Sequence, residues 1–288
     1  MISELIEASK CAVDIAASMK VDELEEKMLE MVPPETPVRH IFAPGIYIRE
    51  LRMKKGMMAI GHSHKVDHLN VMLSGRVIIL NDDGTTKELV APCTFMGKPG
   101  RKVGIIVEDV VWQNIYATNE TDIETLEDTY IEKSDAFLAS EEERKTLLLG
   151  MNNPDRDDFS LMLEETGYTK EQEREESENL NDQIPMPFGW SKASVYSSDI
   201  QGKGYFATAN IEPEEVIAPA MIGFKRTPAG RYTNHAKYPN AKMVIAGDGC
   251  VNLVAMNFIH GCKGGEMGQE ITIDYRQKMS MEEGVCLF

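Results

Sequence analysis

The chain is predicted to be mainly β with helical segments, and three features of its sequence support this class. Two regions, Ile41 to about Ile131 and Pro185 to about Tyr275, consist of short runs rich in Val, Ile and Tyr. Turn-forming residues such as Asn81-Asp-Asp-Gly84 separate the runs. Segments of helical periodicity precede the first region and connect it to the second. Many short strands with such punctuation are typical of a β-sandwich or barrel.

The first thirty residues carry a helical pattern. Apolar side chains recur at intervals of three and four across residues 2–31, and the pattern breaks around Lys20-Val21-Asp22. This spacing predicts two short amphipathic helices. The pair Pro33-Pro34 ends them, because proline cannot continue a helix.

The remaining elements follow in order along the chain. Strands are expected at Ile46–Ile48, Asn70–Leu73, Arg76–Leu80, Val103–Val107 and Trp112–Tyr116. Helices are expected from Ala136 to Leu149 and from Asp157 to Glu165, followed by a polar stretch that ends at Asp182. We therefore predict a helical N-terminal segment (1–36), a β domain (37–132), an acidic helical linker (133–183) and a second β domain (184–288).

Composition places the protein among soluble globular proteins. The 288 residues are 42% hydrophobic, and no run approaches eighteen uninterrupted apolar residues. Charged residues such as Glu4, Glu7 and Lys10 exclude a signal peptide in the first thirty residues. Five widely spaced cysteines without a CxxC pair argue against a disulfide framework or structural zinc site. We expect reduced thiols, no membrane association and a cytoplasmic location.

The negative charge is concentrated in one segment. The net charge is −17, and residues 120–182 hold 21 Asp and Glu against 6 Lys and Arg. An acidic surface repels phosphate backbones, so no direct contact with nucleic acid is expected. The segment is interpreted either as a solvated helix face or as a docking surface for a basic protein partner.

Three histidines lie within seven residues of the first β region. His62 and His64 would point to the same side of a strand, and His68 has the same parity if the strand continues. Three imidazoles on one face suit Zn, Fe, Ni or Mn, with positions left open for water or a substrate.

The spacing around these histidines resembles the first motif of the cupin superfamily. The motif runs from Gly56 through His62-x-His64 to His68, where cupins normally have a glutamate, and on to Gly75. The resemblance implies a cupin-like β-barrel with a divalent transition metal. The second motif would supply a further histidine, but Val103 occupies its place. A metal-free barrel that binds a small ligand, or one that serves only in assembly, is the alternative.

Three segments of the second β region resemble the motifs of SET-domain protein lysine methyltransferases. They are Gly202-Lys203-Gly204-Tyr205, Asn234-His235 with Pro239-Asn240 after it, and Gly268-x-Glu270-Ile-Thr-Ile-Asp274-Tyr275. The resemblance implies a compact SET-like domain that binds S-adenosylmethionine. The implied cofactor-binding residues are Gly202, Lys203, Gly204, Tyr205, Asn234 and His235.

The same resemblance implies a role for Tyr275 as the catalytic tyrosine. Its hydroxyl would lie beside the lysine amine during an in-line methyl displacement, which requires alignment, a neutral amine and oxygen dipoles around the methyl group. Tyr205, Tyr232 and Tyr238 are candidates for a second aromatic residue, with core packing as the other interpretation. The implied partner is a protein substrate, a basic one if it contacts the acidic segment.

Two features favour a different class of function. The insert between the halves of the domain is reduced to about Phe224–Gly230. Cys286 is the one cysteine after Tyr275, so the sequence offers no zinc-binding cysteine cluster to close the site. The alternative is a non-catalytic structural or assembly protein. Proteins that join these two modules resemble some encoded by tailed bacteriophages, which implies the host cytoplasm or the virion. A homo-oligomer is expected in either case.

Overall fold

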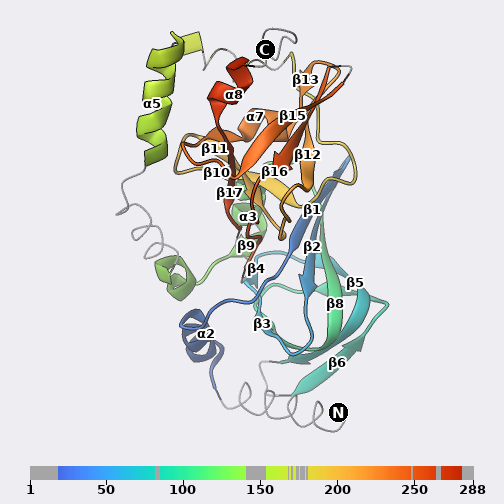
Figure 1. Ribbon diagram of the computed structural model, residues 1–288. Helices are drawn as coiled ribbons and strands as arrows, with labels where there is room; N and C mark the ends of the chain where they lie inside the picture. Colours follow the sequence, from blue (N-terminus) through green and yellow to red (C-terminus); the bar gives the residue numbers. More distant parts are fainter. Residues whose placement is uncertain are drawn as a thin grey trace. The chain divides into compact units, whose positions relative to one another are not determined.

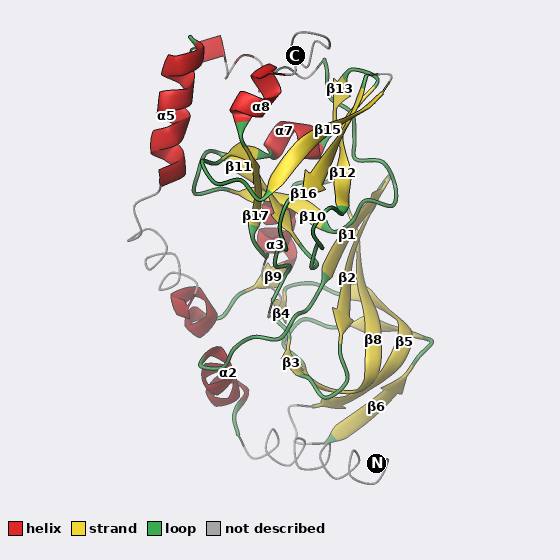
Figure 2. Cartoon of the chain, in the orientation of Figure 1, coloured by secondary structure: helices red, strands yellow, loops and turns green. Residues whose placement is uncertain are grey.

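The structure is a computed structural model. It describes residues 19–81, 85–140, 154–167, 181–247, 249–263 and 267–280, with a few single positions between 169 and 179. Strands predominate over helices in this part of the chain, so the predicted mainly β class with helical segments is confirmed (Figure 1; Figure 2).

The chain divides into two compact units. The N-terminal unit comprises residues 1–150 and 263–265, and the C-terminal unit comprises residues 151–262 and 266–288. Helix α5 (Pro154–Thr166), which matches the expected helix from Asp157 to Glu165, belongs to the C-terminal unit. Residues 1–18 and 141–153 lie outside the described residues, and with them one expected helix and much of another.

The N-terminal unit is built around one large sheet. Its elements are α2 (Val21–Leu29), β1 (Val38–Ala43), β2 (Ile46–Met53), β3 (Met58–Ile60), β4 (Ser63–His64), β5 (His68–Leu80), β6 (Thr86–Val90), β7 (Cys93–Gly97), β8 (Val103–Ala117), α3 (Ile123–Tyr130) and β9 (Ile131–Glu132). Over the described residues, the sheet has seven strands in the order β1-β2-β8-β5-β6, with β3 also paired to β8 and β7 to β5. This path is open, with β1 and β6 at its ends, so the strands described here do not close the expected cupin-like barrel.

Strands β5 and β8 are longer than expected. The expected runs Asn70–Leu73 and Arg76–Leu80 form one strand of 13 residues, and β8 likewise joins two runs into 15 residues. The register between the two strands shifts on either side of Gly75, whose φ is 91°. A Cβ there would come within 2.8 Å of the Asp109 carbonyl carbon. The interruption is therefore a β-bulge, which bends the paired strands without ending them.

The C-terminal unit contains two smaller sheets. Besides α5, its elements are β10 (Ala193–Ser197), β11 (Lys203–Ala207), β12 (Val216–Ile222), β13 (Lys225–Arg226), α7 (Pro228–Tyr232), β14 (Asn234–His235), β15 (Ala241–Gly247), β16 (Cys250–Ala255), β17 (Glu270–Ile273) and α8 (Tyr275–Ser280). Among the described residues, the strand orders are β10-β11-β17-β14 and β13-β12-β16-β15, four strands in each. Strand β14 runs parallel to β17, with Asn234 opposite Thr272 and His235 opposite Ile273.

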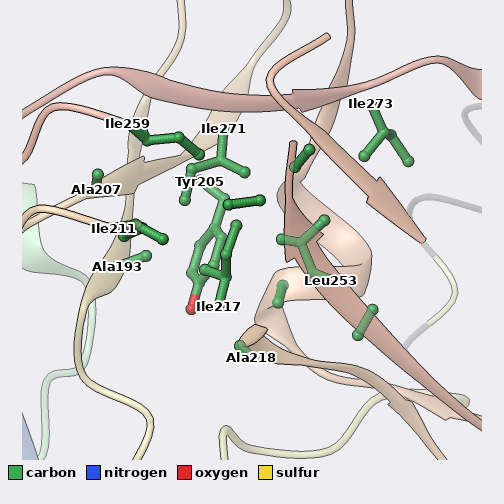
Figure 3. Close-up of a cluster of buried hydrophobic side chains, with 14 of the residues drawn as sticks. Ala193, Tyr205, Ala207, Ile211, Ile217, Ala218, Leu253, Ile259, Ile271 and Ile273 are labelled. Atoms are coloured by element: carbon green, nitrogen blue, oxygen red, sulfur yellow. The ribbon is translucent and has the colours of Figure 1, made fainter. Parts of the chain in front are cut away.

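One apolar core supports both sheets of the C-terminal unit. Its buried members include Tyr205, Ile217, Leu253, Ile259 and Ile271, and Figure 3 shows the Tyr205 ring lying among aliphatic side chains. Each large side chain buried in this way stabilises the fold by about 1.5–3 kcal/mol. The core fixes the positions of β11, β14 and β17, whose ends carry the residues described next.

Candidate functional site

Asn234 connects three separate segments of the C-terminal unit. Its Nδ2 lies 2.7 Å from Oε1 of Glu270, 3.1 Å from Oγ of Ser198, 3.2 Å from the carbonyl oxygen of Lys203 and 3.3 Å from that of Gln201. The Ser198 hydroxyl in turn donates to the Glu270 carboxylate at 2.8 Å. The turn between β10 and β11, strand β14 and the start of β17 therefore meet around one amide group.

The two glycines of this turn have different roles. Gly202 has a φ of 51°, and a Cβ there would meet nothing within 4 Å, so its backbone borders open space. Gly204 lies against the protein itself: a Cβ would collide with Oε1 of Glu270 and come within 2.7 Å of its Cδ. Glycine is thus required at 204 by packing and at 202 by backbone conformation.

Tyr275 places its hydroxyl beside a backbone carbonyl. The hydroxyl donates a hydrogen bond to the carbonyl oxygen of Thr233 at 3.0 Å. The ring packs edge-on against Phe159 of α5, with ring centroids 6.1 Å apart. Thr233 directly precedes Asn234. The Tyr275 hydroxyl therefore contacts the backbone one residue before the Asn234 amide.

His235 is buried and contacts residues of α5 and α8. Its Nδ1 accepts a hydrogen bond from the backbone N–H of Tyr275 at 3.1 Å, so its Nε2 carries the hydrogen of the neutral ring and donates to Asp158 at 3.0 Å. The Arg276 guanidinium, 2.8 Å from Asp158, holds the pKa of that carboxyl below its usual value, and His235 acts in the same direction. This side chain connects α5 to the start of α8.

Tyr205 is a core residue. It is 2% exposed, and burial raises the pKa of its hydroxyl. Its side chain lies inside the apolar cluster, as the core-packing interpretation expects, so a contact with the cofactor would come from its backbone (Figure 3). Of the other two tyrosines considered, Tyr232 packs against the same cluster and Tyr238 is 78% exposed. The structure thus brings together Gly202, Lys203, Gly204 and Asn234, but not the side chains of Tyr205 and His235.

Two charged residues near this site were not anticipated. Asp158 lies in the acidic segment, where its helical position was predicted but nothing distinguished it from the surrounding carboxylates. Arg276 follows Tyr275 and contacts both Asp158 and Glu165 at 2.8 Å. The one indication in the sequence was the position of Arg276 next to Tyr275, the expected catalytic tyrosine.

The three histidines of the N-terminal unit do not converge on one point. The His64 and His68 rings stack with centroids 4.0 Å apart, whereas the His62 ring lies edge-on against Phe137. In the described part of the chain, no three His, Cys, Asp or Glu side chains are placed to hold a metal ion. The described residues thus show no such ligand set, and metal binding by His62, His64 and His68 stays a prediction.

The physical reason is the course of the backbone. Strand β4 contains only Ser63 and His64, and His68 begins the separate strand β5. The alternation argument required one continuous strand through all three positions. Burial, the largest cause, lowers the pKa of His62 and of His64 to about 3, so both rings are neutral at physiological pH. Val103, found where a further ligand would lie in a cupin, is a buried core residue.

A scan against protein-family models found no match, and a search of curated proteins found no relative. Among solved structures, the chain is similar to a cupin domain from Bordetella pertussis, with 18% identity, a TM-score of 0.26 and coverage of 31% of this chain and 98% of that chain. It is also similar to KdgF from Halomonas sp., with 11% identity and a TM-score of 0.27. That match covers 32% of this chain and 87% of KdgF.

A third similar structure is an HTH_3 family transcriptional regulator from Vibrio cholerae, with 18% identity and a TM-score of 0.25. That match covers 30% of this chain and 52% of the regulator, so the chain spans about half of the regulator's length. No helix in the described residues is long and apolar enough to cross a membrane.

Proposed function

We propose that the C-terminal unit binds S-adenosylmethionine and transfers its methyl group to a protein lysine. The observation that carries the proposal is the meeting of the Gly202 turn, Asn234 and Glu270. The Tyr275 hydroxyl bonds to the carbonyl of Thr233, the residue before Asn234. Segments far apart in the sequence are thus neighbours, which supports the proposal.

The described residues suit such a cofactor in two respects. The open space beside Gly202 allows a ligand to approach the backbone closely. Arg231, three residues before Asn234, has buried Nε and Nη1 atoms without a hydrogen-bond partner among the described residues. A carboxylate such as that of the cofactor's methionine moiety would satisfy these donors, because arginine binds carboxylates in bidentate fashion.

In this proposal the protein positions the reactants and supplies hydrogen-bonding oxygens, and the cofactor supplies the reactive group. When bound, S-adenosylmethionine supplies a methyl group activated by its sulfonium charge. The Tyr275 hydroxyl hydrogen is directed at Thr233, so the tyrosine oxygen presents lone pairs that can accept a hydrogen bond from a neutral lysine amine. The two oxygens, 3.0 Å apart, form a preorganised dipole pair of the kind that stabilises developing positive charge.

Calorimetric titration with S-adenosylmethionine tests the proposal. The matched variants are Gly202→Leu and Gly223→Leu, because Gly202 and Gly223 have φ values of 51° and 54° and neither would place a Cβ within 4 Å of another atom. Both substitutions strain the backbone equally, but only the first enters the proposed site. Binding lost in Gly202→Leu and retained in Gly223→Leu supports the proposal.

Wild-type protein that binds no cofactor, or two variants with equal affinity, would contradict the proposal. The assembly role, in which both β units act as scaffolds, would then become the better hypothesis. Both functions expect the chain to associate with a second copy of itself. Light scattering measures the mass of that oligomer directly.

A further inference from the structure

The acidic segment of the chain contributes a helix to the surroundings of Tyr275. The sequence allowed this segment to be a solvated face or a docking surface, yet Asp158 and Phe159 of α5 are turned toward the protein. Asp158 is buried, and the Phe159 ring packs against His235 of β14 and Tyr275 of α8. Asp157, one residue earlier on the same helix, is exposed. Two neighbouring positions of α5 therefore differ sharply in their surroundings.

Two hydrogen bonds in series connect Asp158 to the backbone of Tyr275. Tyr275 is the first residue of α8, so its N–H has no partner within the helix, and it donates to Nδ1 of His235 at 3.1 Å. On the other side of the ring, Nε2 lies 3.0 Å from Oδ2 of Asp158, and an ionised carboxylate can only accept. Both contacts require the same form of the neutral ring, with the hydrogen on Nε2.

A carboxylate on the opposite side of the imidazole would favour the other form. Oδ1 of Asp274 lies 3.7 Å from Nδ1 of His235 and accepts from the backbone N–H of Arg276 at 3.0 Å. A ring with its hydrogen on Nδ1 would turn that hydrogen toward Asp274 and could no longer accept from Tyr275. Asp158 selects against this form, because it requires the hydrogen on Nε2.

The Tyr275 ring and hydroxyl have contacts of their own. The ring centroid lies 5.4 Å from that of His235 and 6.1 Å from that of Phe159, and those two rings are 6.1 Å apart. The hydroxyl donates to the carbonyl oxygen of Thr233 at 3.0 Å. Separate contacts thus hold the backbone, ring and hydroxyl of Tyr275, and α5 supplies one of them through Phe159 and orients another through Asp158.

Arg276 ties α5 to the residue after the tyrosine. Its Nη1 lies 2.8 Å from Oδ2 of Asp158, and its Nε lies 2.8 Å from Oε2 of Glu165. These carboxylates are about two helical turns apart on one face of α5. The Glu165 side chain is 59% exposed and that of Asp158 is 9% exposed, so water screens the contact with Glu165 more strongly. Asp158 is therefore the main anchor, and it serves His235 and Arg276 together.

We propose that Asp158 is a positioning residue for methyl transfer and acts through His235 to hold Tyr275 in place. This inference rests on the proposed function, and it gives part of the acidic segment a role in the site. Asp158 reaches Tyr275 only through His235 and touches no reacting atom. The hydrogen bonds that join the Gly202 turn to Asn234 do not involve α5. Loss of Asp158 should consequently slow transfer without weakening cofactor binding.

The test compares Asp158→Ala with Asp157→Ala in the full chain. In Asp158→Ala, kcat for transfer to lysine peptides should fall about tenfold or more, because a small misplacement of a reacting group costs up to about 100-fold. The affinity for S-adenosylmethionine, measured by calorimetry, should stay within about twofold of wild type. Asp157→Ala should change neither value. Asp158→Asn keeps an oxygen that can accept from Nε2–H of His235, so its kcat should be intermediate.

Amide hydrogen exchange at Tyr275, measured by NMR, follows the same contact without using activity. Exchange should be faster in Asp158→Ala than in wild type or Asp157→Ala, because the acceptor ring is no longer held. Circular dichroism shows whether each variant is folded, and Asp158→Asn is compared with Asp157→Asn if the alanine variant is unfolded. Wild-type protein that transfers no methyl group would refute the proposed function, and the exchange rate would still decide whether Asp158 positions Tyr275.

Three results would overturn the positioning role. These are equal kcat in Asp158→Ala and Asp157→Ala, a loss of cofactor affinity as large as the loss in kcat, and an unchanged exchange rate at Tyr275. The second result would show that Asp158 supports the whole site and does not act on the tyrosine in particular.

Discussion

The contact between Gly204 and Glu270 gives a prediction that can be worked out from the structure. A Cβ on Gly204 would collide with Oε1 of Glu270 and lie 2.9 Å from Cε2 of Phe206. The phenyl ring can rotate away, but the carboxylate is held by Asn234 at 2.7 Å and by Ser198 at 2.8 Å. Gly204→Ala should therefore expel the carboxylate and break both hydrogen bonds.

The expected cost is about 3 kcal/mol in the free energy of unfolding. Each hydrogen bond to a charged group contributes about 1.5–3 kcal/mol, and the half-buried carboxylate recovers part of this from water after it moves. Gly204 itself does not have a positive φ, so alanine adds no backbone strain there. The whole effect should consequently depend on the presence of Glu270.

A double-mutant cycle isolates this dependence. Glu270→Ala should cost about 3 kcal/mol alone, and adding Gly204→Ala to it should cost less than about 0.5 kcal/mol, because the obstructing group has been removed. Urea unfolding followed by tryptophan fluorescence measures each value. The chain has two tryptophans, so a Trp112→Phe background leaves Trp190 as the reporter for the C-terminal unit. Additive costs for the two substitutions would refute the proposed contact.

Three further predictions concern the same unit. Tyr275→Phe should leave cofactor affinity near wild type and reduce methyl transfer to lysine peptides about 100-fold, measured with labelled cofactor; equal rates would remove this hydroxyl from the mechanism. Asp158→Asn should cost about 1–2 kcal/mol at pH 7, measured by urea unfolding. Because Arg276 lowers the pKa of Asp158 in the folded state, that loss should vanish as pH falls below about 4 through the folded-state pKa, and a pH-independent loss would contradict the ion pair. Leu253→Ala should cost about 2.7–5 kcal/mol in the same assay, and a cost below 1 kcal/mol would contradict a closely packed core.

The β regions could be predicted because apolar runs and turn residues are local signals. What such signals could not show is whether a polar interruption ends a strand or forms a bulge. Ser74-Gly75 interrupts the apolar pattern of β5, yet Gly75 lies directly against the backbone at Asp109 and the ladder continues. That outcome depends on the partner strand, which lies more than thirty residues away.

The two candidate sites differ in how far sequence could describe them. The family resemblance implied one cofactor site for the glycine turn and Asn234, and in the structure the Asn234 amide contacts that turn and Glu270. For Tyr205 the sequence left core packing and a role at the site open, and the structure shows the side chain in the core. For His62, the decisive neighbour is Phe137, which no spacing rule connects to it.

A row of polar side chains on the N-terminal sheet was beyond sequence reasoning for a related reason. Arg49 is opposite Asn114 and His40, which lie on other strands and carry no motif. Only the strand register reveals that these groups share one face.

Amide hydrogen exchange with and without S-adenosylhomocysteine, the expected product, tests the central claim most directly. Bound ligand should slow exchange in residues 199–205 and 234–236 of the wild-type protein, and Gly202→Leu should abolish the effect while Gly223→Leu retains it. Unchanged exchange in these segments at saturating ligand, or protection confined to the N-terminal unit, would contradict the assignment of the cofactor site.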